Sequence, residues 1–281
     1  MSFAAVLLFI FISHYKSAYN IQTEKTEEPI MHIIVIKART IILALAIIIA
    51  LPALLFAPKA LEAFSSRDGR ELPIYSVERA DNKIALTFDC AWNADDIDSI
   101  LDTLSQNKCT AAFFVTGDWV EKYPDAVEKI HKAGHIVGNH SYNHADYIKL
   151  SAEEIKADIK KADECIKRIC GEAPLYMRMP SGAYNDNAVI AAESCGKICV
   201  QWSVDSLDYR ENATEDSILS RLVKTKEGDI LLMHNGTKLT SKLLPKIIKG
   251  LKKNYEFVSL DELIYREGFE VDASGRQVLV K

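Results

Sequence analysis

The sequence predicts an α/β fold built on a parallel sheet. From residue 82 onward, short apolar runs alternate with stretches in which apolar residues recur at helical spacing. This repeated order of strand and helix is typical of parallel sheets. In addition, polar residues capable of catalysis directly follow most of the apolar runs. The expected strands lie at 84–88, 111–115, 135–137, 175–177, 198–202, 230–233 and 257–260.

Helices are expected between these strands. The clearest spans 151–170, where isoleucines recur on one face and Ser151 with Glu154 forms a capping box. The folded domain is expected over 82–281, after a polar linker at 64–81. The same apolar spacing predicts further helices at 95–106, from the cap residue Thr214 to 223, and at 238–251.

The composition is that of an ordinary globular protein. The chain has 281 residues, of which 48% are hydrophobic and 26% are charged, so one sizeable core is expected. The formal net charge is -5, which does not indicate a broad basic surface for phosphate backbones. We therefore expect no nucleic-acid partner, and the sequence does not set the oligomeric state.

An apolar run near the N-terminus predicts a membrane anchor. From Thr40 to Ala57 nearly every residue is apolar, which approaches the roughly 20 residues that a helix needs to cross a bilayer. Lys37 and Arg39 precede the run, and positive charge on that flank keeps the N-terminus in the cytoplasm. A single-pass signal anchor is expected within 31–63, with the catalytic domain on the extracytoplasmic side.

Two alternatives to this anchor stay open. A cleaved signal peptide has the same pattern and would give a secreted protein, although Pro58, Lys59 and Glu62 make a poor cleavage site. Met31 also begins a signal-like segment by itself. In that case residues 1–30 are an extension that does not belong to the natural protein.

The six cysteines are too few for a disulfide-dense scaffold, and none has CxxC spacing. Small buried side chains are the simplest interpretation. One or two disulfides are the alternative, with Cys165/Cys170 and Cys195/Cys199 as candidate pairs.

Residues capable of catalysis stand at the carboxyl ends of five predicted strands. In a β/α barrel this face holds the active site, because the loops after the strands converge there while apolar side chains fill the interior. Carboxylate, imidazole and guanidinium groups from five loops should therefore meet at one place. These residues are Asp89, His140, His144, Arg178, Asp205, Asp208 and His234.

Two histidines in this set indicate a metal site. His140 and His144 are four residues apart, a spacing that would place both imidazoles on one side of a helical turn where they can share a divalent metal. The alternative is a pair of solvated loop histidines. Asp89 ends an apolar strand, where an unpaired carboxylate is costly to bury. A helix-capping role is less favoured for Asp89, because Asn93 is better placed for it.

Five short motifs occur in order along the predicted domain. They are TFDCAW at 87–92, HSYNH at 140–144, RMPSG at 178–182, DSLDY at 205–209 and LMH at 232–234. Together they resemble the polysaccharide deacetylases of the NodB homology type, the fourth family of carbohydrate esterases, over 82–268. The resemblance implies a distorted (β/α)7-type barrel, a divalent metal such as zinc, cobalt or manganese, and hydrolysis of an N-acetyl or O-acetyl group on a sugar.

The resemblance also implies roles for the matching residues. Asp89 corresponds to the general base, and Arg178 to the group that orients it. His234 corresponds to the general acid, and Asp208 to the carboxylate that sets the pKa of His234. The remaining correspondences are His140 and His144 as metal ligands, the Ser181 backbone N–H at the oxyanion, Leu232 at the acetyl methyl group, and Tyr209 as a substrate contact.

Three positions depart from the family pattern. Cys90 stands where the family has a second, metal-binding aspartate, Ser181 replaces an aromatic residue, and Tyr209 replaces a tryptophan. The first departure removes a charged oxygen ligand, which should weaken the binding of hard cations. Cys90 is then either a small buried residue or, as a thiolate, a ligand that favours zinc. The role of Asp205 stays open.

The sequence thus predicts a membrane-tethered, metal-dependent deacetylase. Its expected substrate is peptidoglycan or another polymer that contains N-acetylglucosamine, such as a chitin-like chain. One alternative is a non-catalytic wall-binding protein that has lost its metal with the change at Cys90. A glycosidase, the other alternative, needs two carboxylates flanking the bond, and it leaves the histidine pair without a function.

Overall fold

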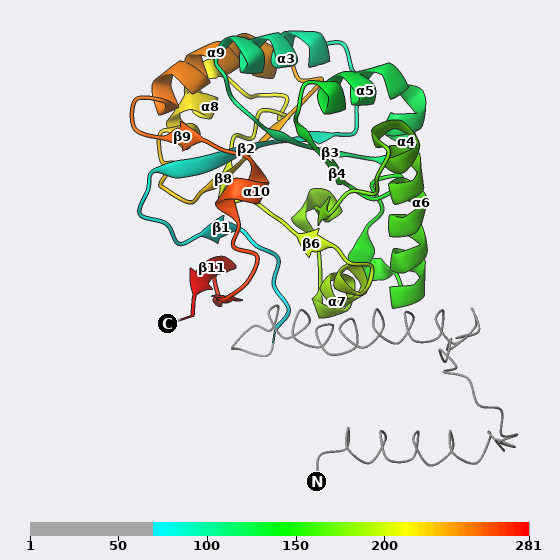
Figure 1. Ribbon diagram of the computed structural model, residues 1–281. Coiled ribbons are helices and arrows are strands. Elements are labelled where there is room, and N and C mark those ends of the chain that lie inside the picture. The colour runs from blue at the N-terminus through cyan, green and yellow to red at the C-terminus, as the bar shows by residue number, and fades with distance from the viewer. Residues whose placement is uncertain (1–69, 281) are drawn as a thin grey trace, which may run out of the picture. The chain divides into compact units, whose positions relative to one another are not determined.

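The computed structural model describes residues 70–280, and its centre is a curved, all-parallel sheet (Figure 1). The strands follow the order β6-β5-β4-β3-β2-β8-β7, with β9 beside β2. The predicted α/β fold with a parallel sheet is therefore confirmed. The strands of this sheet are β2 (Lys83–Cys90), β3 (Ala112–Val115), β4 (Ile136–Asn139), β5 (Tyr176–Met177), β6 (Ile198–Cys199), β7 (Val204–Asp205), β8 (Ile230–His234) and β9 (Glu256–Phe257).

Two of the predicted strands differ in the structure. The run at 198–202 contributes only the two-residue strand β6, and a separate strand, β7, follows it. The run at 257–260 leaves the sheet after Phe257, because the Ser259 side chain accepts a hydrogen bond from the Glu262 N–H and so begins a short helix. Apolar content alone does not show where a short strand stops pairing.

Helices cover the outer side of the curved sheet (Figure 1). The capping box of Ser151 and Glu154 is present at the start of α6, as predicted. Thr214 caps α8, also as predicted. Helix α3 begins after Asp96, whereas the Asn93 side chain accepts a hydrogen bond from the Asp95 N–H within the preceding turn. The helices are α3 (Ile97–Gln106), α4 (Gly117–Lys122), α5 (Pro124–Lys132), α6 (Ala152–Cys170), α7 (Asp186–Ser194), α8 (Glu215–Leu222), α9 (Thr240–Leu251) and α10 (Leu260–Leu263).

Strand β2 divides its side chains between two cores. Successive residues of a strand point to opposite faces of the sheet. Ala85 packs with residues from the inner faces of neighbouring strands, and Asp89 lies on that same inner side. The residues of the other face pack against α3, α5 and α9, and they are Ile84, Leu86, Phe88 and Cys90. This alternation therefore places Asp89 inside the curved sheet and Cys90 in the layer between strand and helices.

The segment just before residue 82 belongs to the fold. Ile74 and Val77 are buried, with 2% and 0% of their surface exposed. The Ile74 N–H donates to the Cys199 carbonyl at 2.9 Å, and the Val77 N–H donates to the Gly228 carbonyl at 2.9 Å. The segment thus joins the end of β6 to the turn before β8. The boundary predicted for the 64–81 linker therefore lies too late in the chain. Ile74 and Val77 are isolated apolar residues in the sequence, and the residues that they contact lie far away along the chain.

A second, smaller sheet contains the chain's last strands. Strand β1 (Ser76–Val77) pairs in parallel with β11 (Arg276–Leu279), which pairs antiparallel with β10 (Phe269–Val271). Phe269 and Val271 pack with Ile74 and Val77 in the inner core. Strands β10 and β11 therefore fix the position of the segment that precedes β2.

The predicted N-terminal segments cannot be compared with the described residues. The anchor expected within 31–63 and the extension at 1–30 lie outside them, and no helix within 70–280 is long and apolar enough to cross a membrane.

All six cysteines are free thiols, so neither Cys165/Cys170 nor Cys195/Cys199 is a disulfide. Most are buried, in agreement with the simpler interpretation.

Candidate active site

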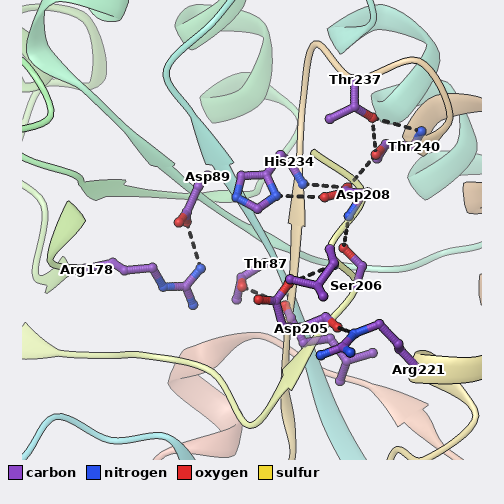
Figure 2. Close-up of polar contacts among 12 residues, drawn as sticks. Thr87, Asp89, Arg178, Asp205, Ser206, Asp208, Arg221, His234, Thr237 and Thr240 are labelled. Atoms are coloured by element: carbon purple, nitrogen blue, oxygen red, sulfur yellow. Dashed lines mark hydrogen bonds and ion pairs between the residues drawn. The ribbon is translucent and has the colours of Figure 1, made fainter. Parts of the chain in front are cut away.

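A cavity of about 470 Å³ opens at the carboxyl ends of the strands. Most of the residues selected from the sequence line it, and two stand directly behind the lining. Arg178 contacts Asp89 and Asp208 contacts His234, as Figure 2 shows. Cys90 is the one predicted candidate that lies apart from the cavity. The selected residues in the lining are Asp89, His140, His144, Ser181, Asp205, Tyr209, Leu232 and His234.

Asp89 and Arg178 form a buried ion pair. Nη1 of Arg178 donates to Oδ1 of Asp89 at 2.8 Å, and the arginine side chain is fully buried. Its other two guanidinium nitrogens, Nε and Nη2, donate to the carbonyl oxygens of Val200 and Gln201. Burial by itself would raise the pKa of Asp89, but Arg178 and the nearby histidines outweigh it and hold that pKa below its ordinary value. Asp89 is therefore a carboxylate at neutral pH.

The geometry of His140 fixes which ring nitrogen is free. Nδ1 of His140 lies 2.9 Å from the Arg178 carbonyl oxygen. Because a carbonyl can only accept, this bond requires the proton on Nδ1 and leaves a lone pair on Nε2. Nε2 lies 3.6 Å from Oδ2 of Asp89. Burial lowers the pKa of His140 to about 4, so the ring is neutral near pH 7.

His140 and His144 lie side by side, with ring centroids 5.1 Å apart, but not on a helical turn. Ser141 and His144 have positive φ angles, 68° and 59°, which interrupt any helix. The Asn139 side chain accepts a hydrogen bond from the Ser141 N–H and stabilises the turn. The two imidazole rings are therefore close together, as predicted. The predicted helical turn is wrong, because Ser141 and His144 have left-handed backbone conformations that reverse the direction of the loop.

His234 is held by Asp208 at the end of β8. Nδ1 of His234 lies 2.7 Å from Oδ1 of Asp208, and the His234 backbone N–H donates to Oδ2 at 2.9 Å. Burial tends to lower the pKa of His234, but Asp208 outweighs it and raises that pKa above its ordinary value. The rings of Trp92 and Tyr209 flank the imidazole, with centroids 5.5 Å and 4.9 Å away.

Sequence reasoning missed several residues around the site. The buried Thr240 hydroxyl donates to Oδ2 of Asp208, and Thr237 contacts Thr240 in turn. Both threonines follow β8 in the sequence, and Figure 2 shows Thr240 between Thr237 and Asp208, but nothing in the sequence pairs them with Asp208. Trp92 belongs to the motif TFDCAW, but no role was predicted for this residue from the sequence. Further lining residues that were not selected are Asp118, Asn143 and Trp202.

Three predicted residues shape the cavity wall. The carboxylate of Asp205 accepts a hydrogen bond from the Leu207 N–H at 2.8 Å, and burial raises the pKa of Asp205. Asp205 therefore stabilises the turn that leads to Asp208. Ser181 has a positive φ of 56°, and its N–H donates to no backbone or side-chain acceptor within the described part of the chain. Leu232 is an apolar lining residue with 2% of its surface exposed.

The side chains at the cavity supply only part of a metal-binding site. His140 and His144 offer two imidazoles beside a carboxylate. Cys90 is fully buried among apolar side chains, and burial raises its pKa well above the ordinary value, so the thiolate interpretation is not supported. Within residues 70–280 there is no group of three or more His, Cys, Asp or Glu side chains placed to hold a metal ion. Among the described residues that line the cavity, His140 and His144 are the two candidate ligands.

Comparison with known proteins decides the family. A family model described as polysaccharide deacetylase matches residues 76–200. A peptidoglycan-N-acetylglucosamine deacetylase of Bacillus cereus is 34% identical over 64% of this chain and 68% of its own length. The chain belongs to the polysaccharide deacetylase family. The family includes hydrolases named as peptidoglycan deacetylases, and the bond that such an enzyme cleaves in an N-acetyl group is a carbon–nitrogen bond other than a peptide bond.

Two further relatives of this polysaccharide deacetylase show the range of the family. The peptidoglycan-N-acetylmuramic acid deacetylase PdaA of Bacillus subtilis is 30% identical over 66% of this chain and 72% of its own length. A solved structure described as a CE4 family pseudoenzyme from Bacillus anthracis is 30% identical, covers 69% of each chain and has a TM-score of 0.66. The fold of this family is thus shared by proteins described as enzymes and by a pseudoenzyme.

Proposed function

We propose that this protein hydrolyses N-acetyl groups on peptidoglycan or on another polymer that contains N-acetylglucosamine. One observation carries the proposal. The buried carboxylate of Asp89, which is held ionised, and the imidazole of His234, whose pKa is raised, face the same cavity from neighbouring strands. These are the two opposite protonation states that hydrolysis of an amide requires. Relatives named as peptidoglycan deacetylases support the choice of substrate.

Asp89 acts as the general base in this proposal. Arg178 keeps the carboxylate ionised and fixes its orientation through Oδ1. Oδ2 of Asp89 then takes the proton from the water that attacks the acetyl carbonyl. Because Arg178 is also bound to two backbone carbonyls, the base does not change position as its charge changes.

His234 acts as the general acid. An amine leaves an amide only when its nitrogen is protonated, so the acid must hold a proton near neutral pH. Asp208 raises the pKa of His234 and holds the ring through Nδ1, which leaves Nε2 to donate to the departing nitrogen.

His140 and His144 are the proposed metal ligands. When a divalent ion such as zinc, cobalt or manganese is bound there, it supplies the Lewis acidity that polarises the acetyl carbonyl and activates water. The hydrogen bond from Nδ1 of His140 to the Arg178 carbonyl keeps Nε2 unprotonated and fixed in direction. The low pKa of His140 keeps the ring neutral, as a ligand must be.

The remaining wall residues fit the acetyl group. The free N–H of Ser181 can donate to the carbonyl oxygen as negative charge develops on it. Leu232 provides an apolar surface for the methyl group, and the ring of Tyr209 covers one side of His234.

In this proposal residues 31–63 anchor the domain at the outer side of the cell membrane. Fractionation of cells into membrane and soluble proteins tests this location.

A second candidate function is binding of wall polysaccharide without catalysis. It is favoured by the placement of Cys90, which leaves the described residues with two histidines and no third metal ligand. The solved structure described as a CE4 family pseudoenzyme gives a precedent for the loss of catalysis on this fold.

Acetate release distinguishes the two candidates. The full chain in detergent should release acetate from N-acetylated glycan strands when zinc, cobalt or manganese is supplied, and Asp89→Asn should lower the rate by about 10²–10⁴-fold. Asp102→Asn, an exposed carboxylate on α3, serves as the control and should behave like the parent. Retained glycan affinity without acetate release from any strand would favour the binding protein.

A further inference from the structure

A second cavity, of about 420 Å³, adjoins the active-site cavity. Trp92 and Tyr209 line both cavities. The loop after β7, at 208–213, and the loop after β8, at 236–239, form the remaining wall. A ligand that places one unit beside His234 would therefore extend over these two rings into the second cavity.

The two shared aromatic residues are exposed although they lie beside the buried centre. Trp92 has 47% of its surface exposed and Tyr209 has 44%. Each ring packs against His234 on one side, which holds it in place. Rings held in this way at the border of two cavities offer flat, amphipathic surfaces on which a sugar ring can pack.

The exposed charged lining of the second cavity consists of two cations and one acid. Arg210 and Lys238 are exposed, and neither forms an ion pair with another residue of the described chain. Glu211 is the one exposed acid in the lining, because Asp208 is buried and bound to His234. Residues 230–255 contain six lysines and no aspartate or glutamate, although the whole chain has a net charge of -5. Lys238 therefore lies in a lysine-rich segment of the chain.

We propose that this second cavity binds a carboxylate-bearing unit of the glycan strand, next to the sugar whose acetyl group is removed. Arg210 and Lys238 contact the carboxylate, while Trp92 and Tyr209 pack on the sugar between the two sites. The inference rests on the proposed function and narrows its substrate class: an anionic glycan is favoured over a neutral one. Two sources offer this carboxylate in peptidoglycan, namely the lactyl ether of the sugar and the peptide attached to it.

Binding of fully deacetylated strands tests the proposal without turnover. The probes are three strands of matched length whose freed amines are all methanesulfonylated and therefore uncharged: one with free lactyl groups, one with peptides attached, and a neutral chitosan-type oligomer. The full chain should bind at least one anionic strand more tightly than the neutral one. The double variant Arg210→Glu/Lys238→Glu should weaken binding of that anionic strand about tenfold, as expected for two exposed charge pairs, and leave the neutral strand unchanged. The strand that responds identifies the source of the carboxylate.

Lys249→Glu/Lys253→Glu is the matched control, because these exposed lysines lie in the same lysine-rich segment but outside the second cavity. The proposal is overturned if the control pair has the same effect as the Arg210/Lys238 pair, or if all three strands bind equally to parent and variant. Failure of the proposed catalytic function has a different signature: no acetate is released from N-acetylated strands, while the charge-dependent difference in binding persists.

Discussion

Asp89 and His234 are register partners on the neighbouring parallel strands β2 and β8. Residues in register on adjacent strands point to the same side of the sheet. The pairing thus brings a carboxylate and an imidazole that are 145 positions apart in sequence to one edge of one cavity. Each is then held by a buried partner, Arg178 or Asp208.

Arg178→Ala should destabilise the protein by about 3–5 kcal/mol, because it leaves the buried Asp89 carboxylate without its partner. The free energy of unfolding in urea measures the effect. Arg168→Ala is the control, since the pair of Arg168 with Glu121 is exposed and should contribute less than about 1 kcal/mol. Equal losses for the two variants would contradict the assignment of Arg178 as a buried support.

Asp208→Asn should move the alkaline limb of the rate profile to lower pH. In the parent protein His234 has a raised pKa, so its acid form persists to higher pH and activity falls as the pH rises through that value. Without the carboxylate of Asp208, only the weaker effects of Asp89 and Asp205 oppose burial, and the pKa of His234 drops. Acetate release as a function of pH measures the shift, and Asp216→Asn on the exposed face of α8 is the control. An unchanged limb would show that another group is the acid.

Thr240→Val should lower the free energy of unfolding by about 1.5–3 kcal/mol, because the ionised Asp208 loses one of its hydrogen-bond donors. Valine has nearly the same shape as threonine, so packing changes little. Thr240→Ser keeps the hydroxyl and should recover most of the stability. Chemical denaturation of the two variants provides the measurement, and a serine variant as unstable as the valine variant would point to packing instead.

Cys90→Ala should leave metal affinity unchanged. The thiol lies in the apolar layer between β2 and the helices, away from the cavity, and remains protonated there. Titration of the metal-free protein with zinc compares the variant with the parent, and His140→Ala serves as the positive control with weakened binding. A fall in zinc affinity of tenfold or more for Cys90→Ala would show that the sulfur is a ligand.

Gly228→Ala should destabilise the fold by at least about 2 kcal/mol. Gly228 has a positive φ of 79°, and a Cβ there would stand 1.8 Å from the Val77 carbonyl oxygen. Gly250→Ala is the matched control, because a Cβ at this helical position meets open space and should stabilise α9 by about 0.5–1 kcal/mol. Thermal unfolding compares the two, and similar melting temperatures would contradict the close packing of the segment before β2.

The sequence by itself determined the local elements and the chemical groups. Alternating strand and helix patterns indicated a parallel sheet, and the caps at Ser151 and Thr214 were correct because capping depends on residues three positions apart. The motif residues at strand ends also gathered at one cavity, since parallel strands end on the same side. Such features follow from periodicity and from short-range hydrogen bonds.

Only the tertiary structure decided which side chains support the chemistry and which lie away from it. Cys90 and Asp89 are neighbours in sequence, yet the pleat sends them to opposite faces of β2. The hydrogen bond from Thr240 to Asp208, the closure of the fold by Ile74 and Val77, and the second cavity beside Trp92 all join segments far apart in the chain. A sequence pattern reports which face a residue prefers, but contacts between distant segments exist only after the sheet has curved and its loops have met.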